Sequence, residues 1–187
     1  MSVSVDELGV RLREHALLEG DFVLRSGKRS SWYLDKYRFE TLPELLGPLG
    51  ERLAQAVREH EPDTVRLAGP ALGAVALAAS ASLASGLPFV IVRDSAKAYG
   101  TANRLEGVYE PGELVCLLED VVTSGGALAE AVDALRDAGL VVRNAVCVVD
   151  REEGGADALA RHGVRLRPLY RAGELLVGTK TAANPHG

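Results

Sequence analysis

The sequence predicts an α/β fold with a mostly parallel central sheet flanked by helices. Short apolar runs typical of buried strands, such as 89–92 and 141–150, alternate with segments of helical periodicity. This alternation is typical of parallel sheets that helices cover on both faces. The 187 residues, 47% hydrophobic and 25% charged, have the ordinary balance of one globular domain with a sizeable core. We therefore expect a single domain over residues 1–187.

The N-terminal part of the chain is expected to form a helix followed by a hairpin. Apolar residues recur at helical spacing over 5–18, and Gly20 is expected to end that helix. Short strands are expected at 22–24 and 32–34, on the two sides of a Ser-Gly turn at 26–27.

Further along, strands and helices alternate. Gly139 and Gly163 are placed to end two of the helices. The predicted strands are 64–68, 89–92, 114–118, 141–150 and 164–170, and the predicted helices are 42–60, 74–85, 127–138 and 156–162. The loop over 94–113 is too long for an idle connection in a compact domain, which is typical of a lid or a disordered segment.

Charge and hydropathy exclude several classes of function. The 21 Lys and Arg residues against 26 Asp and Glu residues give a net charge of −5, which argues against nucleic acid as a partner. The N-terminus lacks the apolar segment of a signal peptide, and no window approaches a membrane span, so a cytoplasmic protein is expected. Cys116 and Cys147 lie in apolar runs and are expected to be buried.

The most informative segment runs from Val115 to Leu128. An apolar strand ends in Glu119 and Asp120, a hydroxyl- and glycine-rich turn follows at 123–126, and a helix begins. Carboxylates accept hydrogen bonds from a sugar diol. The backbone N–H groups of the turn, together with the positive end of the helix dipole, suit a phosphate. The segment therefore predicts a sugar-phosphate site.

A second interpretation of this segment is purely structural. The acids would be solvated, and Thr123 or Ser124 would cap the helix. The order of the features favours the sugar-phosphate site over this alternative. The sequence has neither G-x-x-x-x-G-K-[ST] nor a G-x-G-x-x-G that opens a helix, so the P-loop and the dinucleotide fingerprint are excluded.

Other polar or glycine-rich segments also follow predicted strands. They are the turn at 69–73 with glycine at both ends, Arg93, and the pair Asp150 and Arg151. Ligands of parallel sheets bind outside the carboxyl ends of the strands. We therefore expect these segments to meet the acid pair in one crevice. The turn at 69–73 suits a diphosphate, and a plain tight turn is the equal alternative.

The segment from Val115 to Leu128 resembles the phosphoribosyl-diphosphate-binding motif of the type I phosphoribosyltransferases. Three further segments narrow the resemblance to the orotate branch of that family, over about 12–175. They are Ser-Gly-Lys-Arg-Ser-Ser-Trp-Tyr-Leu-Asp at 26–35, Phe-Val-Ile-Val-Arg at 89–93 and Val-Val-Asp-Arg-Glu-Glu-Gly-Gly at 148–155. The resemblance implies the type I phosphoribosyltransferase fold. A small hood would come from about 1–40 and the chain ends, the core from about 41–175, and a flexible tail from 178–187.

The resemblance also implies roles for single residues. The implied catalytic residues are Lys97, Glu119 and Asp120. Phosphoribosyl diphosphate would be bound by Arg93, Lys97, Tyr99, Glu119, Asp120, Val121, Val122, Thr123, Ser124, Gly125, Gly126 and Ala127. Orotate would be bound by Arg25, Tyr33, Thr123 and Arg151. The implied cofactor is Mg²⁺, held mainly by the substrate and without a firm protein ligand.

The loop after Arg93 departs from the family pattern. That pattern is Arg-Lys-x-x-Lys-x-His-Gly, and here it reads Arg-Asp-Ser-Ala-Lys-Ala-Tyr-Gly over 93–100. Asp94 replaces a lysine and Tyr99 replaces a histidine, so two cations are lost beside an anionic leaving group. In the resembled family this loop is a lid whose basic residues reach the neighbouring subunit's site, which implies a homodimer with shared lids.

The reaction implied is transfer of a 5-phosphoribosyl group from phosphoribosyl diphosphate to orotate, giving orotidine 5′-monophosphate and diphosphate in UMP biosynthesis. Arg25 and Arg151 favour an anionic base, because a guanidinium group matches a carboxylate. Two alternatives stay open. The first is a phosphoribosyltransferase for another base. The second is a regulatory homologue that binds phosphoribosyl diphosphate with little turnover, which the altered lid motivates.

Overall fold

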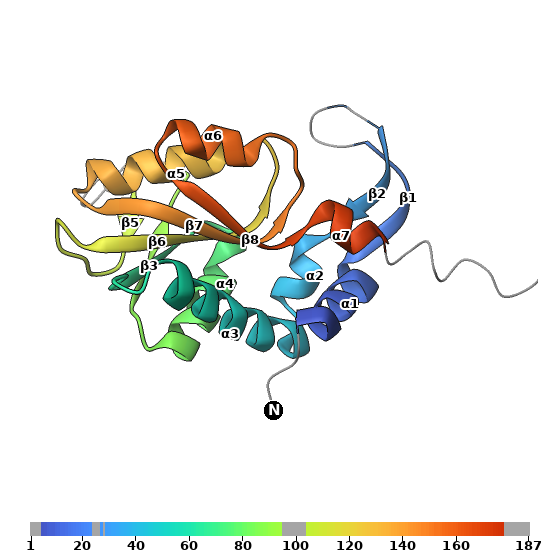
Figure 1. Ribbon diagram of the computed structural model, residues 1–187, viewed down its shortest axis with the longest axis horizontal. Helices are drawn as coiled ribbons and strands as arrows, with labels where there is room; N and C mark the ends of the chain where they lie inside the picture. The colour runs from blue at the N-terminus through green and yellow to red at the C-terminus, as the bar shows by residue number, and fades with distance from the viewer. Residues whose placement is uncertain (1–4, 24–26, 28, 95–103, 178–187) are drawn as a thin grey trace, which may run out of the picture.

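A six-stranded sheet forms the centre of the protein (Figure 1). The computed structural model describes residues 5–23, 27, 29–94 and 104–177. The strands are β3 (Arg66–Pro70), β4 (Phe89–Val92), β5 (Leu105–Glu106), β6 (Leu114–Val122), β7 (Val141–Asp150) and β8 (Arg165–Arg171). Their order is β5-β4-β3-β6-β7-β8, and every neighbouring pair is parallel except β4 with β5. The predicted mostly parallel sheet is confirmed.

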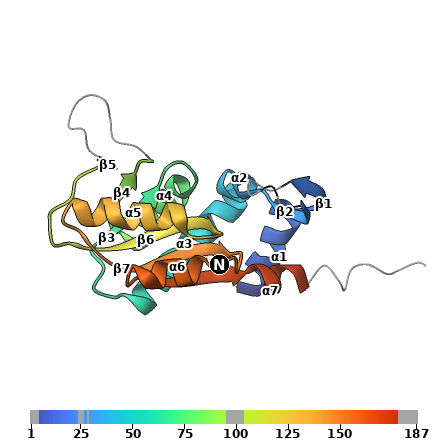
Figure 2. The same ribbon diagram turned by 90° about the horizontal axis from the view of Figure 1, so that it is seen from above.

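Helices cover both faces of this sheet, as the sequence predicted (Figure 1, Figure 2). They are α3 (Pro43–His60) and α4 (Gly73–Ser85) on one face, with α5 (Gly126–Asp137) and α6 (Gly155–Arg161) on the other. Side chains of β6 alternate between two apolar cores. Cys116 and Leu118 join the core on the α3 side, whereas Val115 and Leu117 join the core on the α5 side. Both cysteines are free and buried, as expected.

The N-terminal segment forms a separate two-stranded sheet with helices around it. Its elements are α1 (Val5–Ala16), β1 (Leu17–Val23), β2 (Arg29–Leu34) and α2 (Lys36–Glu40). The last described helix, α7 (Ala172–Val177), lies at the same end of the molecule (Figure 1, Figure 2).

The first predicted helix and the hairpin need correction. The helix ends at Ala16 rather than at residue 18, and Gly20 lies within β1 instead of ending the helix. Strand pairing overrides the helical pattern here, because Leu17 and Leu18 pair with the end of β2. Helices α2 and α7 were not expected, since elements of five and six residues are too short to show a period.

Strand β6 is longer than the sequence suggested. It was predicted to end at residue 118 and continues to Val122, because the pairing with β7 extends to Val122 opposite Asp150. Glu119 and Asp120 therefore belong to the strand itself. Strand β5 is a second unexpected element and lies within the predicted loop over 94–113. The expected flexible tail, 178–187, lies outside the described residues.

None of the helices in the described part of the chain is long and apolar enough to span a membrane.

Helices α3 and α4 approach closely at Gly50. A Cβ on Gly50 would overlap Oγ of Ser80 and lie 2.6 Å from its Cβ. That hydroxyl donates a hydrogen bond of 2.9 Å to the Leu46 carbonyl, so the helices are also joined by a polar contact. Glycine at this position lets the two backbones pack directly against each other.

We predict that Gly50→Ala lowers the free energy of unfolding by about 1–3 kcal/mol, because overpacking forces the helices apart. Urea unfolding followed by circular dichroism measures the change. Gly47→Ala in the same helix is the matched control, since nothing lies within 4 Å of its Cβ position. Its expected change is within about 1 kcal/mol, because helix propensity favours alanine and the following Pro48 offsets part of that gain. Equal losses in both variants would contradict the packing argument.

Candidate active site

The predicted polar segments meet at one edge of the sheet. Parallel strands end on the same edge, and Pro70 of β3 lies level with Val92 of β4, as Val122 of β6 lies level with Asp150 of β7. The chain runs from β3 outward to β4 and then returns to β6 on the other side of β3. Such a reversal of strand order opens a crevice between the two strands, where α/β proteins bind ligands. The expected convergence is confirmed.

Asp120 lies at this crevice and is fully held by protein contacts. Only 2% of the residue is exposed. Its Oδ2 accepts a hydrogen bond of 2.7 Å from Nζ of Lys36, and its Oδ1 accepts one from the backbone N–H of Val121. The neighbouring Glu119 is half-buried, and its Oε1 accepts the backbone N–H of Asp120 at 3.0 Å. Both carboxylates are thus oriented before any ligand arrives.

Three carboxyl groups surround the single ammonium group of Lys36. Glu40 of α2 is 5% exposed, and burial together with the charge of Asp120 raises its pKa to about 8. Burial and then the charge of Asp120 also raise the pKa of Glu119 well above its usual value. Burial opposes the charge of Lys36, but the hydrogen bond and charge of Asp120 outweigh it, so the pKa of Lys36 is raised. Glu40 is therefore protonated at neutral pH, and Lys36 balances the charge of Asp120.

The loop after β6 forms the second part of the crevice. A cavity of about 260 Å³ is lined by Glu119 and by residues 121–128. The residue before α5 is Gly125, with a φ of 79°, and within the described chain no side chain caps this helix. The alternative in which Thr123 or Ser124 caps the helix is wrong. Since the first N–H groups of a helix have no partner within it, those of α5 are available to an anion in the cavity.

Two glycines allow the loop to pack against the start of α6. A Cβ on Gly125 would lie 2.9 Å from the carbonyl oxygen of Gly155, at a backbone φ that favours glycine. A Cβ on Gly155 would in turn overlap the side chain of Val122 and lie 2.7 Å from the Thr123 carbonyl oxygen. Side chains at either position would push the loop away from the sheet and change the shape of the cavity.

Gly73, at the end of the turn after β3, lies directly against Asp120 and Lys36. A Cβ on this residue would overlap Oδ2 of Asp120 and lie 2.6 Å from Nζ of Lys36. Gly69, at the other end of the turn, packs against α4, since its Cβ would lie 2.8 Å from that of Ala78. The turn at 69–73 therefore lies against the Lys36–Asp120 pair at one end and against α4 at the other.

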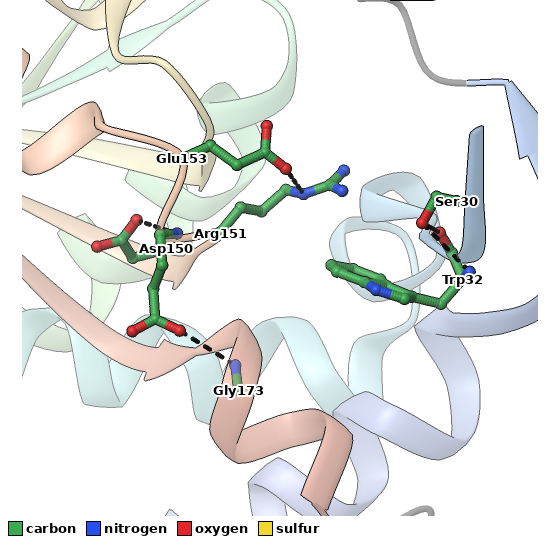
Figure 3. Close-up of polar contacts among 7 residues, drawn as sticks. Ser30, Trp32, Asp150, Arg151, Glu153 and Gly173 are labelled. Carbon is green, nitrogen blue, oxygen red and sulfur yellow. Dashed lines mark hydrogen bonds and ion pairs between the residues drawn. The ribbon is translucent and has the colours of Figure 1, made fainter. Parts of the chain in front are cut away.

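Arg151 occupies the third part of the site, just after β7 (Figure 3). Its backbone N–H donates to the Val122 carbonyl at 2.9 Å, which ties it to β6. Its guanidinium carbon lies 4.5 Å from the centroid of the Trp32 ring, and its Nε lies 3.0 Å from Oε1 of Glu153. Figure 3 shows the guanidinium group between this acid and the indole. Trp32 of β2 thus contributes a flat surface that orients the arginine.

The residues around Arg151 fix the local backbone. Glu152 has a φ of 59°, and its backbone N–H donates to Oδ1 of Asp150 at 2.9 Å. Its carboxylate accepts the backbone N–H of Gly173 at 3.3 Å, from the start of α7. This contact joins the segment after β7 to the end of the described chain.

The other expected residues have neighbours other than the acid pair and Arg151, or fall outside the described chain. Tyr33 is 40% exposed and stacks near Phe22, with ring centroids 5.6 Å apart. Because consecutive strand residues point to opposite faces, Trp32 rather than Tyr33 faces Arg151. Arg93 directly follows β4 and pairs with Glu106 at 3.2 Å. The remaining expected residues, Arg25, Lys97 and Tyr99, fall outside the described residues.

Lys36 and Glu40 belong to the site and were missed in the sequence. They lie in α2, which is too short to show an apolar period. A lysine and a glutamate on an otherwise unremarked segment give no signal of their own, since they reach Asp120 only through the fold.

The acid pair of β6 is followed directly by the loop that opens α5. A parallel sheet of this order that carries this acid pair and loop defines the type I phosphoribosyltransferase class.

Similarity to known proteins narrows this class to one family. It is 49% identical to the orotate phosphoribosyltransferase of Methanocella arvoryzae over 157 residues, which cover 84% of this chain and 88% of that protein. It is 47% identical to the orotate phosphoribosyltransferase of Halobacterium salinarum over 176 residues, covering 94% and 98%. The crystal structure of Mycobacterium tuberculosis orotate phosphoribosyltransferase matches with a TM-score of 0.81 at 31% identity, covering 91% of this chain and 98% of that one. No family model matches. The chain belongs to the orotate phosphoribosyltransferase family.

The raised pKa of Glu40 has a consequence for stability. Folding raises the pKa of this carboxyl group from 4.5 to about 8, so the folded state holds the proton more tightly than the unfolded chain does. The resulting stabilisation is complete at a pH below 4.5, and it is lost as the pH rises through about 8. We therefore predict that Glu40→Gln has a flatter stability profile than the wild type between these values. At the upper end the variant is expected to be more stable, by on the order of 1–3 kcal/mol.

Urea unfolding across this pH range measures the difference. Glu44→Gln, which alters an exposed carboxyl group at the start of α3, is the control. A Glu40→Gln profile parallel to that of the wild type at every pH would contradict the assignment.

Proposed function

We propose that this protein is an orotate phosphoribosyltransferase that converts orotate and phosphoribosyl diphosphate into orotidine 5′-monophosphate and diphosphate, in UMP biosynthesis. The observation that carries the proposal is the oriented acid pair of β6, followed directly by an uncapped helix N-terminus around a cavity. The relatives named orotate phosphoribosyltransferase support the same activity. A structure of the Mycobacterium tuberculosis enzyme with phosphoribosyl diphosphate also resembles this chain, with a TM-score of 0.76 at 28% identity.

In this proposal the phosphoribosyl group spans the crevice. Glu119 and Asp120 accept hydrogen bonds from the ribose hydroxyls. The backbone of residues 121–127 and the hydroxyls of Thr123 and Ser124 surround the 5-phosphate. The diphosphate would be bound by Arg93, Lys97 and Tyr99. Arg93 would exchange its pairing with Glu106 for the more highly charged ligand.

The base would lie between Thr123 and Arg151. The guanidinium group suits the orotate carboxylate, because both are planar and pair through two hydrogen bonds. Trp32 keeps the guanidinium plane in one orientation, and Glu153 holds Nε from the other side. Arg25 and Tyr33 remain proposed contacts to the base.

The chemistry asked of the protein is orientation and charge stabilisation. A ring N–H nitrogen of orotate attacks the anomeric carbon and gives up its proton to solvent, and the bond to diphosphate breaks with the electron pair leaving on the diphosphate. Glu119 and Asp120 face the positive charge that develops on the ribose, and the lid cations face the leaving group. The protein forms no covalent bond to the substrate in this scheme.

Mg²⁺ is the proposed cofactor, and the donor chemistry of the crevice fits it as an ion that arrives with the substrate. Both oxygens of Asp120 already accept hydrogen bonds, and Oε1 of Glu119 accepts another, so the acids are suited to contact through water. Bound to the diphosphate, the ion would neutralise part of the leaving-group charge. A homodimer with shared lids, a hood over about 1–40 and a cytoplasmic location complete the proposal.

The test is a direct assay of purified protein with orotate, phosphoribosyl diphosphate and Mg²⁺, following the loss of orotate absorbance. We predict that Asp120→Asn lowers kcat/KM by roughly 100-fold or more, because the ribose loses an oriented charge at the reacting centre. Asp63→Asn, on an exposed residue at the opposite edge of the sheet, is the control and keeps wild-type activity. Near wild-type turnover by Asp120→Asn would refute the assigned site.

Conversion of uracil or hypoxanthine in place of orotate would favour another base, and phosphoribosyl diphosphate binding without turnover would favour the regulatory alternative.

Trp32 tests the base side separately. Trp32→Ala is expected to raise KM for orotate roughly 3- to 30-fold, because the guanidinium of Arg151 loses the ring that orients it. KM for phosphoribosyl diphosphate is expected to change by less than about 3-fold, since the site residue that the ring contacts is Arg151, on the proposed base side. Steady-state kinetics with each substrate varied in turn measures both values. Trp32→Phe retains a flat ring and is expected to recover most of the affinity; equal changes in both KM values would contradict this role.

A further inference from the structure

Lys36, like Glu40, is a residue of this site to which neither the sequence pattern nor the resemblance gave a role. It is the first residue of α2, and its side chain crosses to β6 and pairs with Asp120 at 2.7 Å. About a third of its side chain is exposed, 34%, whereas that of Asp120 is 3% exposed. The ammonium group is therefore anchored on one side and accessible on the other.

The position of this ammonium group is defined by three neighbours. It contacts Oδ2 of Asp120, it lies 2.6 Å from where a Cβ of Gly73 would be, and it lies 5.4 Å from the ring centroid of Tyr37. Gly73 ends the turn after β3, and Asp120 lies near the end of β6. Lys36 thus places a positive charge beside both the turn after β3 and the acid-bearing end of β6.

The β3 side of the crevice needs such a charge. The chain from residue 67 to residue 92, which includes the turn at 69–73, contains no Lys or Arg. Arg66 is held at the other end of β3 by Glu113, at 2.7 and 2.9 Å. Arg93 pairs with Glu106 beyond the end of β4. Among the described residues, Lys36 is the cationic residue that lies close to this turn, at Gly73.

The orientation of the substrate then follows from the two ends of the site. With the 5-phosphate at the start of α5 and the ribose at the acids of β6, the anomeric carbon and its diphosphate point away from α5, toward the turn after β3. An ammonium group has three N–H donors, and Asp120 occupies one of them. The others are free to reach an anion at Gly73.

We propose that Lys36 is a diphosphate-binding residue of this site, which keeps its contact with Asp120 and donates to the diphosphate of bound phosphoribosyl diphosphate. This inference rests on the proposed function. It assigns the positive charge on the β3 side of the crevice to a residue that lies more than thirty positions before that turn in the sequence.

The experiment is isothermal titration calorimetry of phosphoribosyl diphosphate, inorganic diphosphate and ribose 5-phosphate, each with Mg²⁺, into the wild type and Lys36→Met. Loss of a charge-assisted hydrogen bond is expected to weaken phosphoribosyl diphosphate and diphosphate binding roughly 10- to 100-fold. The affinity for ribose 5-phosphate, which lacks the diphosphate, is expected to fall by less than about 3-fold. Lys36→Arg retains the charge and is expected to recover most of the diphosphate affinity.

Two further variants keep the test decisive. Lys36→Gln retains a hydrogen-bond donor for Asp120 without the charge, so it gives the same expected result if Lys36→Met does not fold, as judged by near-UV circular dichroism. Arg38→Met, on an exposed residue of the same helix that pairs with Asp35 at 3.4 Å, is the matched control and leaves all three affinities unchanged.

The outcomes separate this inference from the proposed function. Equal weakening of ribose 5-phosphate and phosphoribosyl diphosphate would overturn it, because Lys36 would then act only through Asp120. Unchanged diphosphate binding in both neutral variants would overturn it as well. If the wild type turns over orotate in either case, the proposed function stands; a wild type that does not bind phosphoribosyl diphosphate refutes the proposed function itself.

Discussion

Burial of β6 on both faces is the constraint on which the rest of the structure depends. A strand with apolar residues on both faces is stable only where helices cover the sheet from both sides, and α3 with α4 and α5 with α6 provide that cover. Parallel connections then place every turn after a strand at the same edge. The acids that end β6, the glycine turn after β3 and the arginine after β7 are brought together for this reason.

The same burial makes charge expensive at the site. Asp120 lies within the protein, and its charge is tolerated because the ammonium group of Lys36 and the Val121 N–H group contact it. Glu40, next to it, has the opposite outcome: burial and the charge of Asp120 raise its pKa to about 8. Lys36 thus balances the charge of Asp120, while the neighbouring Glu40 is protonated. This arrangement fixes the orientation of Asp120 and leaves the exposed side of Lys36 facing the crevice.

Close backbone approach is the second requirement of the site. Gly73 leaves room for the Lys36–Asp120 pair, and Gly125 with Gly155 lets the β6 loop lie against α6. Each of these positions would be blocked by a single Cβ atom. In the proposed function, Asp94 and Tyr99 stand where the family pattern has a lysine and a histidine, so more of the positive charge would have to come from cations outside this loop.

The sequence by itself determined the α/β class, the parallel sheet and the acid pair with its glycine-rich loop. Each of these features depends on local periodicity or on residues that are adjacent in the chain. Residues 89–92 and 141–150 were predicted with their true boundaries for that reason. The tertiary structure alone decided that α1 ends at Ala16, since the pairing of β1 with β2 overrides helix propensity. It also decided that Trp32 faces Arg151 and that Lys36 reaches Asp120. Such contacts join residues more than eighty positions apart, and no local pattern records which distant side chains the packing of helices and strands will bring together.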